Sequence, residues 1–405
     1  MDIYKEALFF HRENKGKIDV ISKVKTENEH DLALAYSPGV AQPCREIAKN
    51  PNLLNTYTAR ANMIAVVSDG SAVLGLGNIG ARASLPVMEG KCVLFKQFGG
   101  VSAFPVCIDS QNNDVIVNTI KLLEPSFSGI NLEDIAAPRC FEIESRLKSE
   151  TKMVIFHDDQ HGTAIVTLAG LFNAAKYYEL DLKKIKIVIN GAGSAGYSIV
   201  KMLSFLGIGN IMVCDTKGII YKKRPDLNFA KLEIAELTNP QGEKGFLAEA
   251  VNSADVFIGV SVADQLTPEM VSSMAKKPVI FALANPDPEI KYEIAKSIGV
   301  EIIATGRSDY PNQVNNVLAF PGVFRGALDC NAADINMEMK IAAARAIASV
   351  VENEIKTDYI IPKPFDRRVL PAVATAVAAG AIRTGAAPAD TDIDWIEYNA
   401  KNILR

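Results

Sequence analysis

Short apolar runs alternate with amphipathic stretches along the second half of this chain. Each run is near-continuous in apolar residues, as strands of a parallel sheet are when both of their faces are buried. The runs are Ile185–Ile189, Asn210–Cys214, Asp255–Val260, Val279–Ala284 and Glu301–Ala304. Helical patterns lie between them, and a long helix over 335–356 is expected to close the set. This alternation predicts a doubly wound parallel sheet of the Rossmann type from about residue 160 onward.

The first half has a different rhythm, with a polar, proline-punctuated start of about sixty residues. The pattern there predicts strands over Met63–Ser68 and Met153–His157, apolar segments near Cys92–Phe95 and Phe104–Asp109, and helices over 2–12, 44–50, 113–124, 139–149 and from Gly162 onward. A chain of 405 residues is too long for one ordinary core. We therefore expect an N-terminal α/β domain over 1–158 and a nucleotide-binding domain with C-terminal helices over 159–405.

Composition narrows the class of protein without identifying it. Apolar residues make up 48% of the chain, charged residues 22%, and the net charge is −4, which gives no reason to expect a nucleic-acid partner. The N-terminus has charges throughout and no apolar core of a signal peptide. The weakly polar run Val369–Ile382 is shorter than the roughly 20 residues that span a bilayer. Six cysteines without a C-x-x-C pair are typical of reduced thiols, so we expect a cytoplasmic, non-membrane protein.

Two G-x-G-x-x-G motifs occur, and their contexts differ. One runs from Gly75 to Gly80 and has no acidic residue closing a following strand, so it predicts a tight turn or a close approach to substrate. The other follows the strand Ile185–Ile189 and opens a helix; it consists of Gly191, Ala192, Gly193, Ser194, Ala195 and Gly196. The next strand ends in Asp215, about twenty residues further on, where a carboxylate can accept from ribose hydroxyls. This arrangement predicts a dinucleotide site.

The choice between NAD and NADP stays open. Asp215 favours NAD because a carboxylate repels a 2′-phosphate. Basic residues that could neutralise such a phosphate follow closely, namely Lys217, Lys222, Lys223 and Arg224.

Two acidic pairs suggest a metal site. Glu133–Asp134 lie at the start of a predicted helix, and Asp158–Asp159 come directly after a predicted strand, where side chains face the crevice of an α/β sheet. Converging carboxylates favour a hard cation such as Mg²⁺ or Mn²⁺. Alternatively, Glu133 and Asp134 are first-turn acids that only complement a helix dipole. A zinc site from His157 and His161 is disfavoured, because no cysteine is near in the sequence. The predicted change from strand to helix between the two histidines also spoils the i, i+4 geometry of a helical zinc pair.

At this point the chain resembles the malic enzyme family, in its short bacterial form, over about residues 15–385. The motifs that carry the resemblance are AYSPGV (35–40), SDGSAVLGLGNIG (68–80), LPVMEGKCVLFKQFGG (85–100), LED (132–134), FHDDQHGTA (156–164), GAGSAG (191–196), FALANP (281–286) and NNVLAFPG (315–322). Together these motifs are far more specific than a lone glycine fingerprint.

The resemblance implies roles for particular residues. Lys91 would be the base and Tyr36 the acid that protonates the enolate. Glu133, Asp134 and Asp159 would be the metal ligands, with Asp158 beside them. Asn285 and Asn316 would contact substrate or nicotinamide, and Lys91 would also touch the substrate. Without the resemblance, Lys91 reads as a surface lysine and Tyr36 as a packed tyrosine before a proline turn.

One family feature is missing. Longer malic enzymes have an arginine that grips a malate carboxylate, and the matching position here is Ala72. The anchor of the second carboxylate is therefore unassigned, with the backbone N–H groups of 75–80 or Lys96 as candidates.

The resemblance implies oxidative decarboxylation of L-malate to pyruvate and CO₂ with NAD or NADP and Mg²⁺ or Mn²⁺, in a homodimer or larger homo-oligomer. One alternative is a hydroxy-acid or amino-acid dehydrogenase that does not decarboxylate and needs no metal. Another is a non-catalytic dinucleotide-binding sensor, which predicts coenzyme binding without turnover.

Overall fold

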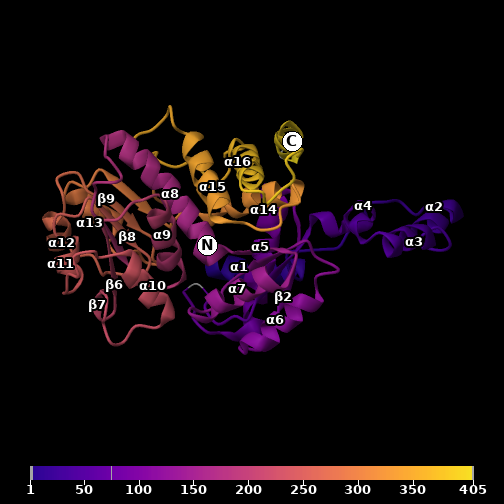
Figure 1. Ribbon diagram of the computed structural model, residues 1–405, viewed down its shortest axis with the longest axis horizontal. Coiled ribbons are helices and arrows are strands. Elements are labelled where there is room, and N and C mark those ends of the chain that lie inside the picture. The colour runs from indigo at the N-terminus through magenta and orange to yellow at the C-terminus, as the bar shows by residue number, and fades with distance from the viewer. Residues whose placement is uncertain (1–2, 74, 404–405) are drawn as a thin grey trace.

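Two parallel sheets lie side by side, each covered by helices on both faces (Figure 1). The computed structural model describes residues 3–73 and 75–403. Residue 2 of the first predicted helix and Leu74 of the 68–80 motif lie outside this part of the chain. The two-sheet architecture confirms the predicted fold class, an N-terminal α/β domain followed by a Rossmann-type nucleotide-binding domain.

The first sheet has the strand order β2-β1-β3-β4, and all its strands are parallel. Its strands are β1 (Met63–Ser68), β2 (Ser102–Cys107), β3 (Gly129–Leu132) and β4 (Val154–His157). Successive side chains of a strand face opposite sides, so Ile64 and Val66 pack with α5 (Gly80–Gly99) on one face. On the other face, Ala65 and Val67 pack with α6 (Asn113–Leu122) and α7 (Arg139–Glu150). The carboxyl ends of all four strands therefore meet at one edge.

The second sheet has the order β10-β9-β8-β5-β6-β7, and only the short β7 is antiparallel. Its strands are β5 (Ile187–Asn190), β6 (Ile211–Asp215), β7 (Gly218–Ile219), β8 (Val256–Gly259), β9 (Val279–Ala282) and β10 (Ile302–Thr305). Its covering helices are α9 (Ser194–Phe205), α10 (Phe229–Leu237), α11 (Leu247–Val251), α12 (Pro268–Ser273) and α13 (Tyr292–Ser297). The chain order reverses between β5 and β8, which is the position where such sheets bind nucleotides.

Helix α8 (Asp158–Tyr178) connects the two sheets and lies between them in Figure 1. Behind it, η3 (Asn316–Leu318), α14 (Phe320–Asp329), α15 (Met337–Ser349), α16 (Val369–Arg383) and α17 (Ile393–Ile403) complete a continuous core. Helix α14 returns to the first sheet, because the Phe95 ring of α5 lies 4.6 Å from Phe320 and 5.2 Å from Phe324. The two sheets are thus joined by shared apolar packing as well as by the chain.

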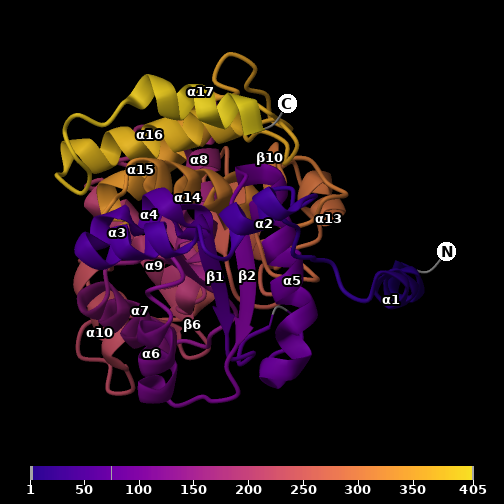
Figure 2. The same ribbon diagram turned by 90° about the vertical axis from the view of Figure 1, so that its right-hand side faces the viewer.

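The N-terminal helices stand apart from this core. They are α1 (Ile3–Asn14), α2 (Glu29–Ala35), α3 (Ala41–Lys49), η1 (Pro51–Leu53) and α4 (Leu54–Tyr57), and none contains a buried residue. The following η2 (Ala59–Asn62) joins the body, where Arg60 donates to the Glu124 carbonyl and Asn62 to the Gly100 carbonyl. Helices α2, α3 and α4 form an arm that projects from the body (Figure 1), and α1 lies away from it on a different side (Figure 2). We use "the arm" below for residues 29–57.

Three predicted elements differ from the structure, besides the helix predicted to begin at Glu133. Cys92–Phe95 is part of the 20-residue helix α5, not a separate segment. The helix predicted from Gly162 begins at Asp158, and the helix predicted over 335–356 covers only Met337–Ser349. The weakly polar run at 369–382 forms most of the packed helix α16, and among the described residues no helix has the length and apolar character needed to cross a membrane.

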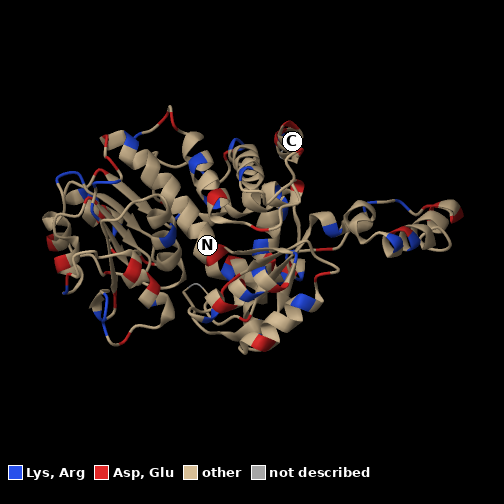
Figure 3. Ribbon diagram, in the orientation of Figure 1, with Lys and Arg blue, Asp and Glu red and all other residues tan. Residues whose placement is uncertain are grey.

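Charged residues of both signs are interspersed over both halves of the molecule in the view of Figure 3. The net charge of the whole chain is −4. The distribution therefore does not favour a polyanionic partner.

Candidate active site

Three acidic side chains meet at the carboxyl edge of the first sheet. Glu133 and Asp134 directly follow β3, and Asp159 lies in the first turn of α8, directly after β4. One carboxylate oxygen from each lies within 4.8 Å of the others, and Glu133 and Asp134 are buried. The backbone N–H of Asp134 donates to Asp159 Oδ2 at 2.8 Å, which fixes the two acids relative to each other. This convergence of oxygen atoms matches what a hard divalent cation requires.

The prediction that Glu133 and Asp134 begin a helix is wrong. They follow a four-residue strand whose residues pair with β1 and β4, and the next helix begins at Arg139. The reading of these acids as complements of a helix dipole fails with it, because no helix begins there. Their backbone is set by strand pairing, and Asn131 in the strand donates to Glu133 Oε2 at 2.8 Å.

Lys91 reaches these acids from α5. Its Nζ lies 2.6 Å from Asp158 Oδ2 and 2.8 Å from Glu133 Oε1, and its side chain is 12% exposed. The ring of Phe320 lies 4.4 Å from the same nitrogen. An amine held between a buried acid pair and an aromatic ring has few alternative positions, so it is pre-organised for a substrate bound at the acids.

Burial and charge act in opposite directions on these groups. Burial lowers the pKa of Lys91, but the facing carboxylates of Asp158 and Glu133 outweigh it and raise the pKa above its ordinary value. Burial raises the pKa of Glu133, Lys91 opposes this, and the neighbouring acids add to the rise. One lysine therefore does not neutralise the cluster, and a divalent cation is the natural complement.

Asp158 links the lysine to the C-terminal half of the chain. Its Oδ2 accepts from Lys91 Nζ and, at 3.1 Å, from Asn316 Nδ2 at the start of η3. Asn316 also exchanges hydrogen bonds with Thr163 of α8, at 3.2 and 3.3 Å. The other oxygen, Asp158 Oδ1, is buried without a hydrogen-bond partner in the described structure. The site is thus assembled from α5, β3, α8 and η3.

The second glycine motif has the predicted strand–turn–helix context. It follows β5, and Ser194 begins α9. A Cβ at Gly196 would lie 1.9 Å from the carbonyl oxygen of Gly191, so only glycine permits this close turn. A pocket of about 400 Å³ lies here, and Gly191, Ala192, Gly193, Asp215, Thr216, Lys231, Ser261 and Val262 line it together with Ala137, Pro138 and Phe141 of the first half. The pocket therefore spans both halves of the molecule.

Asp215 lies at the end of β6, as predicted, but its carboxylate is paired with two basic side chains. Arg224 donates to both oxygens, one at 2.9 Å from Nη1, and Lys231 Nζ lies 2.6 Å from Oδ2. Burial raises the pKa of Asp215, but these hydrogen bonds outweigh it and lower the pKa to about 2. Of the bases considered from the sequence, Arg224 contacts Asp215, whereas Lys217 pairs with Asp226 and Lys222 with Glu236.

Asn285 lies in the turn after β9, where the two halves approach. A Cβ at Gly75, in the first glycine motif, would lie 3.5 Å from Pro286 Cδ and 4.0 Å from the Asn285 carbonyl oxygen. The first motif therefore forms a loop that faces the nucleotide-binding half, and its close approach to a substrate stays a prediction. In the part of the chain that the structure describes, the Asn285 side chain does not hydrogen-bond to Asp158 or Thr163, whereas the Asn316 side chain bonds to both.

Tyr36 is not brought to this cluster within one copy of the chain. It follows α2 at the far end of the arm and is 70% exposed, whereas α5 lies in the body (Figure 1). Lys96, a candidate anchor for substrate, is exposed and lies five residues beyond Lys91, which turns it about 140° around the helix. The structure thus assembles Lys91, Glu133, Asp134, Asp158, Asp159 and Asn316, and leaves Tyr36 apart.

Several contributing residues escaped the sequence analysis. Asn131, Thr163 and Phe320 orient the acids and the lysine, and Lys231 occupies Asp215. For Phe320 and Thr163 a signal existed, because both lie within motifs already quoted. Asn131 sits inside an apolar run and Lys231 is sixteen residues beyond Asp215, so neither spacing pointed to a contact.

The fold and the site define a two-domain dinucleotide-binding protein with an acidic, lysine-containing centre between its sheets. Comparison with known families agrees: residues 13–116 match "Malic enzyme, N-terminal domain" and residues 160–382 match "Malic enzyme, NAD binding domain". The chain belongs to the malic enzyme family.

Individual relatives support the same placement. The chain is 58% identical to the "Bifunctional malic/malolactic enzyme" of Bacillus subtilis, over 100% of this chain and 99% of that protein. It is 52% identical to the "NAD-dependent malic enzyme" of Geobacillus stearothermophilus, over 93% and 78%. The crystal structure of malic enzyme from Pyrococcus horikoshii superposes with a TM-score of 0.95 at 44% identity, covering 99% of this chain and 96% of that one. Other relatives are named for NADP.

Proposed function

We propose that this protein oxidises L-malate with NAD or NADP and releases CO₂ as pyruvate forms. The observation that carries the proposal is the group Glu133, Asp134 and Asp159, whose oxygens converge beside Lys91 at the edge facing the coenzyme pocket. A hydroxy-acid dehydrogenase that does not decarboxylate has no need of converging carboxylates. Decarboxylation does, because charge collects on the C2 oxygen of the keto acid.

Glu133, Asp134 and Asp159 would hold Mg²⁺ or Mn²⁺. The fit rests on the donor set, which is oxygen only, and on the surplus negative charge around one lysine. When bound, the cation supplies Lewis-acid stabilisation of the substrate oxygens. Asn131 orients Glu133, and the backbone N–H of Asp134 orients Asp159, so the ligands are held before any ion arrives.

Lys91 Nζ would take the proton of the C2 hydroxyl while hydride leaves C2 for the nicotinamide. Asp158 and the Phe320 ring keep this nitrogen in place. Lys91 must be neutral to accept a proton. The carboxylates favour its charged form, so its function as a base requires that their charge be shared with another cation.

Tyr36 would protonate C3 of the enolate in the active site of a second copy. The arm carries Leu32, Leu34 and Tyr36 with 56%, 64% and 70% of their surface exposed, which is unusual for large apolar side chains. A homodimer in which the arms are exchanged covers these residues and completes each site. The exposure of the arm supports this arrangement, and so does the distance between α2 and α5 in Figure 1.

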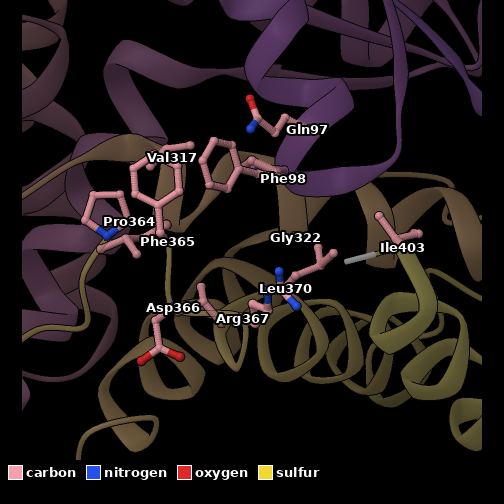
Figure 4. Close-up of a pocket in the computed structure, with 13 residues that line it drawn as sticks. Gln97, Phe98, Val317, Gly322, Pro364, Phe365, Asp366, Arg367, Leu370 and Ile403 are labelled. Carbon is pink, nitrogen blue, oxygen red and sulfur yellow. The ribbon is translucent and has the colours of Figure 1, made fainter. Parts of the chain in front are cut away.

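A hollow of about 280 Å³ beside the site offers a seat for the partner's arm (Figure 4). Its apolar lining includes Phe98, Val317, Pro364, Phe365, Leu370 and Ile403. Val317 follows Asn316, and Phe98 lies on the same helix as Lys91, so the hollow adjoins elements that build the site. Phe365 is 77% exposed in a single copy, which the exchanged arm would cover.

For the coenzyme, we propose that both NAD and NADP are accepted. Arg224 neutralises Asp215, and Lys231, which lines the pocket, keeps ammonium donors for a 2′-phosphate. Asp215 therefore repels a phosphate less than an unpaired carboxylate would. The division into domains at 158/159 and a cytoplasmic location are also proposed; the free, mostly buried cysteines support a reducing compartment.

Replacement Lys231→Glu is expected to raise KM for NADP about tenfold or more while KM for NAD changes less than about twofold. The change replaces a cation that would attract the 2′-phosphate with an anion that would repel it, whereas NAD has no phosphate at this position. Steady-state kinetics with both coenzymes at saturating malate and Mn²⁺ measures this. Lys222→Ala, which removes a surface ion pair with Glu236, is the matched control and should change neither value. Equal effects on NAD and NADP would contradict the assignment.

To test the proposed function, the protein is incubated with L-malate and coenzyme, and the amounts of reduced coenzyme and CO₂ are measured with Mn²⁺ and with excess chelator. One CO₂ for each reduced coenzyme is expected with Mn²⁺, and neither product with chelator.

A further inference from the structure

Glu289 is a carboxyl group buried beneath the ends of two strands of the second sheet. None of its surface is exposed. Its Oε1 accepts from the backbone N–H of Ser261 at 2.9 Å and from the Ser261 hydroxyl at 3.4 Å, and its Oε2 accepts from the Ala284 N–H at 3.1 Å. Among the described residues, no lysine, arginine or histidine lies within 4.0 Å of it. Its carboxyl group is therefore held by two backbone N–H groups and one hydroxyl.

The protein leaves space for this carboxyl group at one glycine. A Cβ at Gly259, the last residue of β8, would lie 2.3 Å from Glu289 Cδ and 2.5 Å from Oε1. Any side chain at 259 would displace the carboxylate from Ser261. Glycine at 259 is therefore what leaves room for the Glu289 carboxyl group.

Of the two loops held by Glu289, one lines the coenzyme pocket and the other approaches the first half of the chain. Ser261 follows β8 and lines the pocket with the Gly191 turn, and Asn190 Nδ2 donates to its hydroxyl at 2.9 Å. Ala284 follows β9 and precedes Asn285 and Pro286, the turn that approaches Gly75 of the first half. One buried carboxylate therefore connects the ends of β5, β8 and β9.

Topology says which end of the coenzyme these loops meet. A dinucleotide lies across the point where the strand order reverses. Asp215 on β6 lies on one side of β5 and takes the adenosine end, whereas β8 and β9 lie on the other side. The loops fastened by Glu289 consequently lie on the nicotinamide side.

The ionised form of Glu289 suits its contacts. Burial raises its pKa above the ordinary value, and the donors from Ser261 and Ala284 offset only part of that rise. Both oxygens already accept from donors that cannot turn away, because two of them are backbone N–H groups. A neutral amide in its place would set an NH₂ group against one of these N–H groups.

We propose that Glu289 is a positioning residue that fixes Ser261 and the Ala284–Pro286 turn in the conformation that binds the nicotinamide end of the coenzyme. The inference rests on the proposed function only in that a nicotinamide coenzyme occupies the pocket. Glu289 itself touches neither coenzyme nor substrate.

Replacement Glu289→Gln is expected to weaken binding of NADH, or of NADPH if that binds wild type more tightly, about tenfold, as measured by fluorescence titration. Binding of AMP, which occupies only the adenosine end, should change less than about twofold. Glu293→Gln, on the exposed face of α13, is the matched control and should change neither. Since these titrations need neither malate nor metal, they remain informative even if the proposed reaction is wrong.

A second variant tests the geometry without changing the charge. Gly259→Ala should weaken binding of the reduced coenzyme as Glu289→Gln does. Adding Glu289→Asp, whose side chain is one methylene shorter, should recover part of the lost affinity. If Glu289→Gln does not fold, Glu289→Asp alone is titrated in its place, and weaker binding of the reduced coenzyme with unchanged binding of AMP is again expected. Unchanged affinity for the reduced coenzyme, or an equal loss of affinity for AMP and for the reduced coenzyme, would overturn the proposal and leave Glu289 a general structural residue.

Discussion

Replacing Lys91 by alanine is expected to lower kcat for malate oxidation about a thousandfold or more, while coenzyme affinity stays within about twofold. The nitrogen of Lys91 is held 2.6 Å from Asp158 and 2.8 Å from Glu133, among the groups that would bind the substrate. Lys91 does not line the coenzyme pocket. The variant should therefore lose chemistry and keep nucleotide binding, measured by steady-state kinetics and by fluorescence titration with reduced coenzyme.

Two controls separate the role of Lys91 as a base from its charge. Lys91→Arg keeps a cation beside Asp158 but cannot accept a proton near neutral pH, so it should be almost as inactive. Lys121→Ala removes a surface ion pair with Glu150 and should retain full activity. Thermal unfolding in Mn²⁺ checks that the acids remain satisfied without the lysine. Turnover of Lys91→Ala near that of wild type would remove the lysine from the mechanism.

Two inactive variants should restore each other when they are co-expressed. Tyr36→Phe cannot protonate the enolate, and Lys91→Ala cannot begin the reaction. If the arm is exchanged, half of the dimers in a random mixture contain both chains, and each of these has one site with an intact Lys91 and an intact Tyr36. The mixture should reach about a quarter of the wild-type rate, from two preparations that are each nearly inactive.

The double variant Lys91→Ala/Tyr36→Phe co-expressed with wild type provides the control, because its mixed dimers contain no site with both residues intact. Sedimentation or light scattering establishes that mixed dimers form. Mixed dimers with no gain in rate would show that Tyr36 acts within its own copy or not at all, and the exchanged arm would be wrong.

The second sheet was predictable because its evidence is local. Each of its five parallel strands is mainly a run of buried apolar residues, and the Gly191 motif lies between a strand and a helix whose patterns are both strong. The two-residue β7 was not predicted. The short strand β3 was not predictable in the same way. It is four residues long, contains Asn131, and is defined by pairing with β1 and β4, which are distant in sequence. A short apolar run does not distinguish strand from helix by periodicity.

Helix ends were the other weak point. Asp158 and Asp159 are first-turn acids, the usual signal of a helix start, yet the prediction began the helix at Gly162. The end of α15 at Ser349 carries neither glycine nor proline, so the helical pattern alone ran on to 356.

For the candidate site, residue types were visible in the sequence but their partners were not. The acids and Lys91 were identified by motif, and the structure brings them together from α5, the end of β3 and α8. The neutralisation of Asp215 by Lys231 depends on where α10 packs, which no spacing encodes. The separation of Tyr36 from Lys91 depends on an arm whose apolar residues have no partner in a single copy.

We propose that a divalent cation, held by the acids after β3 and β4, is what allows malate to lose both hydride and carboxylate. The most direct measurement incubates the purified protein with L-malate, coenzyme and Mn²⁺ and quantifies reduced coenzyme, pyruvate and CO₂ with time, with and without excess chelator. We expect the three products in equal amounts with Mn²⁺ and none with chelator. Reduced coenzyme without CO₂, or an undiminished rate in chelator, would contradict the proposal.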